Sequence, residues 1–181
     1  MHRQFLLNKL SAYHAEDPEE RRLLEVTRRF VEENEDCFER SLSIGHITGA
    51  GWVVNPDRTH ALLTHHRKLN KWLQPGGHAD GDSDVFRVAL REVQEESGID
   101  RIIPLSEDIF DIDVHEVPSH KKDLPHLHYD IRFLFEADML AELKVTHESH
   151  DLQWIPMDRI KEYTGEASIL RMVKKTFSWR P

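Results

Sequence analysis

The sequence predicts an α/β (α+β) fold in which a mixed β-sheet packs between helices, preceded by a helical hairpin. Two observations carry this prediction. Apolar residues recur at helical spacing near the N-terminus and again over residues 84–97 and 166–178. Between these segments lie runs with the composition of strands, separated by turn-forming residues. Because strands precede and follow the central helix along the chain, a layered packing of helices on a sheet is expected.

The N-terminal part is predicted to be a helical extension of the main domain. Asp17 precedes Pro18 and two glutamates, which is typical of a helix start: Asp caps the first turn, proline fits there, and acids favour the positive end of the helix dipole. A shorter helix is expected over residues 5–13. The sequence is therefore divided into an extension, residues 1–42, and a domain, residues 43–181.

The domain opens with runs typical of strands. HITGAGWVVN and HALLTHHR flank the turn sequence Asn-Pro-Asp and are interpreted as a hairpin. DIFDIDVHEV and LHYDIRFLFEA are predicted as two further strands around a polar loop, and LQWIP as a short strand that ends at its proline.

Composition excludes several classes of function. The 181 residues carry a net charge of −9, which argues against nucleic acid or an anionic membrane as a partner. No stretch approaches the ~20 apolar residues that span a bilayer, and the N-terminus has no apolar signal segment. The single cysteine, Cys37, excludes an internal disulfide. A cytoplasmic protein is therefore expected.

The most informative feature is a group of acids on the predicted helix 84–97. Glu92, Glu95 and Glu96 are spaced i, i+3 and i+4, so they share one face of the helix. An apolar stripe is expected on another face, formed by Phe86, Ala89, Leu90 and Val93. Clustered carboxylates repel one another, and a divalent cation removes that cost; Mg²⁺ in particular prefers carboxylate oxygens. The alternative is a solvated acidic helix face.

The loop before this helix is rich in glycine. Gly76, Gly77 and Gly81 permit close backbone approaches that a side chain would block. Such a loop can offer a carbonyl oxygen to a metal ion and N–H groups to a phosphate.

Together, the loop and the helix resemble the Nudix box. Gly77 begins the motif, and Arg91-Glu92-Val93-Gln94-Glu95-Glu96-Ser97-Gly98-Ile99 completes it at the family's spacing. Ser83 stands where the family has a glutamate, and Asp82, one residue earlier, is a candidate substitute for it. The resemblance implies the Nudix αβα sandwich with a mixed sheet, and it does not account for residues 1–42.

The resemblance also implies the chemistry. It indicates a Mg²⁺- or Mn²⁺-dependent hydrolase that cleaves a phosphoanhydride in a small nucleotide by water attack on phosphorus. The residues implied as metal ligands are Glu92, Glu95, Glu96 and the carbonyl of Gly77. Arg91 is expected to orient a glutamate, with Glu95 at i+4 from it. Nudix members differ in their general base, and Glu148, ahead of the last strand, is a candidate besides the box acids Glu95 and Glu96.

Weaker signals surround the box. His126, His128 and Asp130 alternate along a predicted strand, so they share one face and are candidates for metal or phosphate contacts, or else a polar sheet face. His78 directly follows Gly77 and is a further candidate for substrate binding. Two lysines in the preceding loop, Lys121 and Lys122, are candidates for a phosphate clamp or are simply solvated.

Alternative functions remain open at this stage. A Nudix-fold sensor that binds nucleotide without cleaving it is the main alternative, although all three box acids are present. Diphosphate isomerisation on the same fold would need a reactive cysteine, and Cys37 lies in the extension, far from the box. RNA decapping is disfavoured by the net charge. The extension is expected to support a homodimer or to cover the site.

Overall fold

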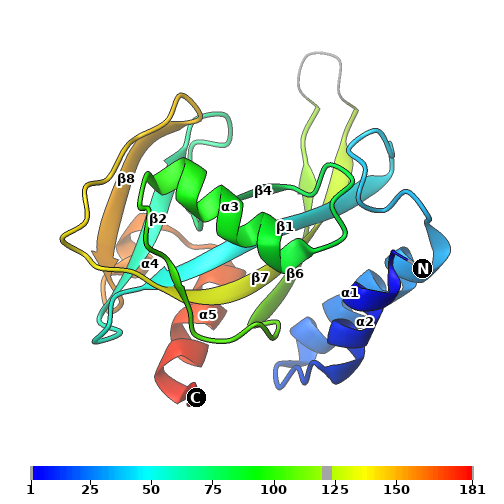
Figure 1. The fold of residues 1–181 in the computed structure, drawn as a ribbon, viewed down its shortest axis with the longest axis horizontal. Coiled ribbons are helices and arrows are strands. Elements are labelled where there is room, and N and C mark those ends of the chain that lie inside the picture. Colours follow the sequence, from blue (N-terminus) through cyan, green and yellow to red (C-terminus); the bar gives the residue numbers. More distant parts are fainter. Residues whose placement is uncertain (1, 120–123, 181) are drawn as a thin grey trace.

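A mixed sheet of eight strands forms the centre of the computed structural model, which describes residues 2–119 and 124–180 (Figure 1). The strands are β1 (Gly45–Val54), β2 (His60–His66), β3 (Lys71–Leu73), β4 (Gly76–His78), β5 (Ile103–Pro104), β6 (Asp111–Val117), β7 (His126–Glu136) and β8 (Ser149–Pro156). The helices are α1 (Gln4–Ala12), α2 (Pro18–Glu33), α3 (Val85–Ser97), α4 (Ile160–Tyr163) and α5 (Ala167–Ser178). Lys121 and Lys122 lie outside the described residues.

Strands β1 and β7 form the centre of the sheet. They run parallel and pair along the whole of β1, from Gly45 with Leu127 to Val54 with Glu136. Strand β4 pairs antiparallel with the middle of β1, at Thr48–Ala50, and β6 pairs antiparallel with β7. The sheet is therefore mixed, as predicted, and over the described residues its one parallel pair joins strands that are distant in the sequence.

The predicted hairpin of the first two runs exists only at its turn. Val54 and Ala61 are the one Cα pair of the β1–β2 register among the described residues. Beyond it the two strands separate, because β1 pairs with β4 and β7 while β2 pairs with β8 and β3. The strands predicted around residues 108–117 and 127–137 are confirmed as the antiparallel pair β6 and β7.

Helices cover both faces of the sheet, which confirms the αβα arrangement (Figure 1). On one face, α3 packs closely on β1: a β-carbon at Gly51 would lie 2.2 Å from Val93. On the other face, α5 packs against Trp52 and Val54 at the end of β1. There Trp52, fully buried, donates a hydrogen bond from its indole to Thr176 at 2.8 Å. No helix of the described residues is long and apolar enough to cross a membrane.

The N-terminal hairpin shares the core of the α3 face. Asp17 caps α2 as predicted, accepting hydrogen bonds from the N–H groups of the second and third residues after it. Phe30 stacks on Tyr129 of β7 with ring centres 3.8 Å apart. At the β6 edge, the buried Glu20 accepts a hydrogen bond from Tyr13 and pairs with Lys175 of α5. The hairpin and α5 therefore meet around the edge of the sheet.

Candidate active site

The buried stripe of α3 differs from the predicted one. It is formed by Val85, Val88, Ala89, Val93, Glu96 and Ser97. Phe86 and Leu90, expected at its centre, are only partly buried at its margin. The buried face of the helix is turned relative to the predicted one. The reason is that glycines of β1 let α3 approach the sheet through its smaller side chains. As a result the core-facing side of the helix carries Glu96, which sequence periodicity placed on a separate acidic face.

Glu96 is a buried carboxylate. It is 8% exposed, and its Oε2 has no hydrogen-bond partner among the residues that the structure describes. Burial, together with the nearby Glu92 and Glu148, raises the pKa of Glu96 to about 8. The N–H of Gly76 donates to this carboxylate and opposes the shift. An uncompensated buried carboxylate is costly, so this oxygen is suited to a cation that the site would hold.

Glu92 faces the glycine strand β4. A β-carbon at Gly77 would lie 2.3 Å from Glu92 Oε2, so the backbone of Gly77 lies directly against the carboxylate. Burial raises the pKa of Glu92, while the charge and hydrogen bond of Arg91 oppose the rise. Gly77, Glu92 and Glu96 are thus brought together at one place, where the loop, β4 and α3 meet.

Arg91 binds a different glutamate from the expected one. Its guanidinium donates to Glu92 Oε1 at 2.8 Å and to the carbonyl of His78 at 3.3 Å. The i+4 partner, Glu95, lies 4.0 Å away and its side chain is 64% exposed. Arg91 therefore orients Glu92 and connects α3 to β4. The carbonyl of His78 in β4 lies closer to the guanidinium than the outward-facing Glu95 carboxylate does.

Asp82 organises the loop before α3. Its Oδ1 accepts a hydrogen bond from the N–H of Asp84 at 3.0 Å, and its Oδ2 accepts two from the Arg87 guanidinium at 2.7 and 3.1 Å. Asp84 in turn caps the helix by accepting from the N–H of Arg87. In this loop an acid next to Ser83 makes the supporting contacts, and it makes them with Arg87 rather than Arg91.

Glu148 belongs to a different segment from the box, directly before β8. Its charge raises the pKa of both Glu92 and Glu96, which places it near them. Its side chain is 52% exposed. Arg67 fixes this segment: its N–H donates to the Glu148 carbonyl at 2.8 Å, and its guanidinium donates to the carbonyls of residues 147 and 149. The half-exposed carboxylate therefore sits on an anchored backbone.

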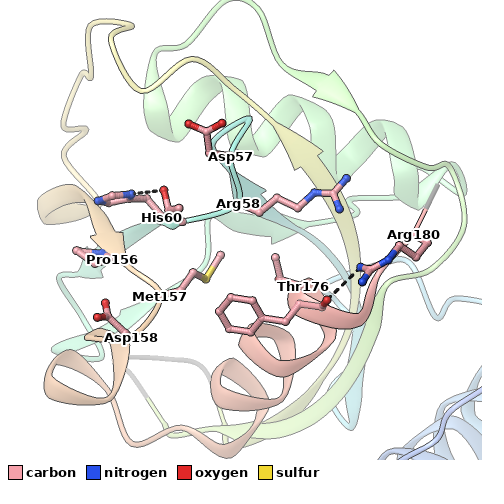
Figure 2. A pocket seen from close by; sticks show the side chains of 10 residues that line it. Asp57, Arg58, His60, Pro156, Met157, Asp158, Thr176 and Arg180 are labelled. Carbon is pink, nitrogen blue, oxygen red and sulfur yellow. Dashed lines mark hydrogen bonds between the residues drawn. The ribbon is translucent and has the colours of Figure 1, made fainter.

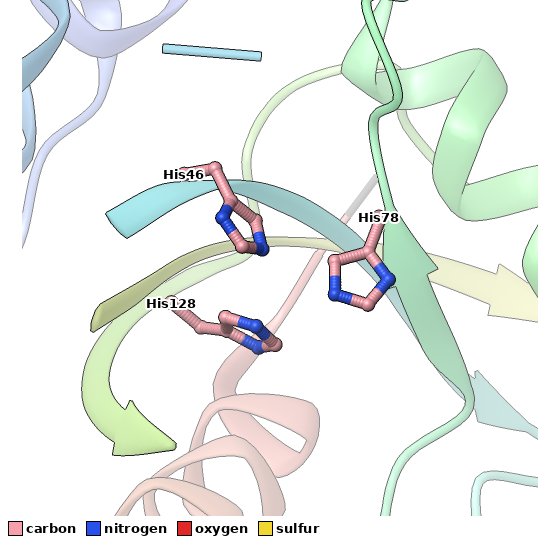
Figure 3. Close-up of side chains that lie close together, drawn as sticks. All are labelled: His46, His78 and His128. Atoms are coloured by element: carbon pink, nitrogen blue, oxygen red, sulfur yellow. The ribbon is translucent and has the colours of Figure 1, made fainter. Parts of the chain in front are cut away.

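A histidine cluster lies on the opposite face of the sheet. His46, His78 and His128 converge with ring centres 4.8–5.1 Å apart (Figure 3). His126 lies 5.0 Å from His46, and His115 lies 5.5 Å from His128. The predicted candidates His78, His126 and His128 are therefore together, but their rings point away from α3. Successive residues of a strand alternate in direction, so Gly77 faces the carboxylates and His78 faces this cluster.

Sequence reasoning missed His46 and His115. His46 opens an apolar run and looks there like a strand boundary. The parallel register of β1 and β7 places it directly across from His128, and the antiparallel register of β6 places His115 across from His128 on the other side. Asp130, expected to join the histidines, instead accepts hydrogen bonds from Thr48, Gln74 and Arg132. Only the strand registers could have shown this.

A concavity of about 530 Å³ lies away from both groups, between the β1–β2 turn, the end of β8 and α5 (Figure 2). Arg58 and Arg180 line it together with Asp57 and Met157. Its lining contains no residue of the 77–99 segment. Because a box carboxylate is required for the predicted chemistry, we assign the candidate active site to the Glu92–Glu96 region and not to this concavity.

Comparison with known proteins identifies the family of the chain. The NUDIX domain family model matches residues 45–175, most of the chain. The chain belongs to the Nudix family. This Nudix hydrolase is 24% identical over 104 residues to a Caenorhabditis elegans protein described as bis(5'-nucleosyl)-tetraphosphatase [asymmetrical], and the match covers 55% of the chain and 71% of that protein.

Two solved structures share the fold of this Nudix hydrolase. A C. elegans Ap4A hydrolase in a binary complex superposes with a TM-score of 0.58 at 18% identity, covering 73% of the chain and 95% of that protein. The MutT protein of Methanosarcina mazei Go1 gives a TM-score of 0.56 at 21% identity, covering 76% and 96%. Nudix hydrolases act on pyrophosphate bonds of small nucleotides and generally use divalent metal ions. The hairpin of α1 and α2 precedes the matched region.

Proposed function

We propose that this Nudix hydrolase uses Mg²⁺ or Mn²⁺ to cleave a phosphoanhydride bond in a small nucleoside diphosphate-linked compound, by attack of water on phosphorus. The observation that carries the proposal is the buried, unpartnered oxygen of Glu96 beside Glu92. A carboxylate is held there against its own desolvation cost, as a metal ligand would be.

The residues present fit such an ion. Glu92 and Glu96 converge beside the backbone of Gly76 and Gly77, and Glu95 lies one turn outward with its side chain in solvent. Glu92, Glu95, Glu96 and the carbonyl of Gly77 would hold the metal. When bound, the ion would neutralise charge on the pyrophosphate oxygens and activate water.

The remaining roles belong to side chains around these ligands. Arg91 holds Glu92 by a charge-assisted hydrogen bond and so limits the carboxylate to one orientation. Glu148 would accept the proton of the attacking water, because it is a half-exposed acid from outside the box whose backbone is fixed by Arg67. Glu95 and Glu96 are the alternative bases within the box.

A buried cysteine disfavours isomerisation of a diphosphate on this fold. Cys37 is fully buried, and burial raises the pKa of its thiol to about 11. A thiol that stays protonated and inaccessible to substrate cannot act as the reactive cysteine such chemistry needs. The proposed hydrolysis needs no thiol, because it uses the carboxylates of α3, the backbone of β4 and Glu148.

A substrate screen tests the proposed function. The chain is offered dinucleoside polyphosphates such as Ap4A, ADP-ribose, nucleotide sugars, CDP-alcohols and nucleoside triphosphates, each with Mg²⁺ or Mn²⁺. The C. elegans relative places dinucleoside polyphosphates first in this order. Turnover that requires metal and disappears in Glu92→Gln, Glu96→Gln supports the proposal. Metal-independent turnover, or equal turnover by that variant, contradicts it.

We further propose that the hairpin supports a homodimer. Phe5 on α1 and Ile44 after the hairpin are 51% and 57% exposed, although both are large apolar side chains. A second copy would cover them. Light scattering of the wild type and of Phe5→Gln, Ile44→Gln measures this directly: a dimer that the variant converts to a monomer is expected, and a monomeric wild type contradicts it.

A further inference from the structure

The histidine cluster combines three strands that the Nudix box does not use. His46 comes from β1, His78 from β4 and His128 from β7, and all three rings face one space (Figure 3). One ring nitrogen of each lies within 4.8 Å of one from each of the other two. The alignment follows from register: His46 pairs with His128, and His78 pairs with Thr48, two residues further along the same face of β1.

His46 has unsatisfied polar atoms at the centre of this group. It is 2% exposed, and both of its ring nitrogens lack a hydrogen-bond partner among the described residues. His128 Nε2 is in the same condition. Buried polar groups without partners cost free energy, so several of them converging on one point indicate a ligand that would satisfy them.

The donor atoms select the kind of ligand. The three side chains offer ring nitrogens to one common space, and no carboxylate of the described residues belongs to this group. A neutral imidazole presents a nitrogen lone pair, which binds a metal cation. Imidazole ligands favour Zn²⁺ and similar transition ions, whereas Mg²⁺ and Mn²⁺ favour oxygen.

The groups around the three rings fit such a site. His126 Nδ1 hydrogen-bonds the carbonyl of Leu124 at 2.8 Å, which leaves its Nε2 lone pair available 5.0 Å, ring to ring, from His46. His115 Nδ1 forms a hydrogen bond with the Asp113 carboxylate at 3.2 Å. Carbonyl and carboxylate partners of this kind fix the tautomer of metal-binding histidines.

We propose that His46, His78 and His128 bind one divalent transition-metal ion, Zn²⁺ in preference to Mg²⁺, at a site separate from the carboxylates of α3. Three histidines leave a further position for water or for His126. The ion joins β1, β4 and β7, and it holds β4 in the position that brings Gly77 against Glu92. This second site has a supporting role for the box and does not depend on which nucleotide is cleaved.

Zinc binding by the full chain tests the proposal. The protein is stripped with chelator, incubated with Zn²⁺, dialysed, and its zinc content is measured by mass spectrometry. One zinc per chain is expected for the wild type and for His60→Gln, a histidine on β2 outside the cluster. Less than a tenth of that content is expected for His46→Gln, His128→Gln. Equal zinc in this variant, or none in the folded wild type, overturns the proposal.

A second measurement tests the proposal even if the double variant does not fold. His78→Gln alters a half-buried ring only, and circular dichroism verifies its fold. Zinc at a hundredfold excess over its dissociation constant is expected to raise the melting temperature of the wild type by roughly 5–10 °C, and that of His78→Gln by less than half as much. An equal shift in both proteins contradicts the assignment.

One further variant tests whether zinc binds at the histidines or at the carboxylates of α3. Glu92→Gln, Glu95→Gln, Glu96→Gln is expected to keep its zinc and to lose Mg²⁺-dependent hydrolysis. Zinc lost together with the carboxylates would mean that the ion sits on α3, and would overturn the histidine assignment whatever the outcome for hydrolysis.

Discussion

Gly77 lies directly against the Glu92 carboxylate: a β-carbon on Gly77 would stand 2.3 Å from Glu92 Oε2. The atom that it would meet is the end of a flexible side chain, so the fold can tolerate a methyl group while the carboxylate cannot keep its position. A substitution at Gly77 is therefore expected to affect activity much more than stability.

Gly77→Ala is expected to lower kcat/KM by about 10²-fold, since a displacement of about 1 Å at a reacting centre has that effect. The free energy of unfolding should change by less than about 1 kcal/mol. Gly165→Ala is the matched control, because a β-carbon there meets nothing within 4 Å. Kinetics and urea unfolding of both variants measure this. A Gly77→Ala enzyme with wild-type kcat/KM would contradict the role given to the contact.

Glu96→Gln should raise stability and abolish activity. In metal-free protein at pH 7, burial raises the pKa of Glu96 to about 8, so folding carries the cost of protonating or desolvating this acid. A neutral amide removes that cost, and urea unfolding in chelator is expected to show a gain of about 1–3 kcal/mol. Glu95→Gln, on the solvent side of the same helix, should change stability by no more than about 0.5 kcal/mol. A Glu96→Gln protein less stable than wild type would argue against the burial cost.

Glu148→Gln tests the assignment of the general base. Loss of a general base lowers kcat by about 10²–10⁴-fold, and the half-exposed position of Glu148 predicts an unchanged melting temperature. Glu142→Gln, an exposed acid earlier in the same connection, is the control and should keep wild-type kcat. If kcat of Glu148→Gln stays within about threefold of wild type, the base lies within the box.

Asp113 is expected to make stability depend on acid pH. Burial would raise the pKa of Asp113, but the hydrogen bond from His115 and the charge of Arg132 outweigh it and lower the pKa from 3.8 to about 2. A folded-state pKa below the unfolded one gives stability that is present above pH 3.8 and is lost as pH falls toward 2. Asp113→Asn should therefore cost about 1–2 kcal/mol at pH 7 and progressively less below about pH 4.

Urea unfolding at pH 7 and pH 3 measures this difference. Asp158→Asn, an exposed aspartate after β8, serves as the control and should leave both values unchanged. A difference between Asp113→Asn and wild type that is as large at pH 3 as at pH 7 would mean that packing, and not the ion pair with Arg132, accounts for the effect.

Local features of the chain were predictable because they depend on neighbours in the sequence. The helix capped by Asp17 and the helix that carries the box depend on contacts between residues a few positions apart. The same holds for the Nudix box, whose loop and helix are contiguous, so membership of the family and the layered fold followed from residues 77–99 and the order of elements.

The orientation of α3 was not predictable from periodicity alone. Helical spacing groups Glu92, Glu95 and Glu96, but it does not say which of them faces the sheet. The glycines of β1 decide this by letting the helix approach through Val85, Ala89 and Val93, which turns Glu96 inward and Glu95 outward.

The sequence by itself determined the family, the layered fold and the set of acids on one helix, because each of these depends on the spacing of residues that are close together in the chain. Only the tertiary structure decided which acid is buried and which histidines meet. His46 and His128 are 82 positions apart, and the parallel register of β1 with β7 is what places their rings together. Strand register is set by the packing of the whole sheet, so no local pattern around either histidine contains it.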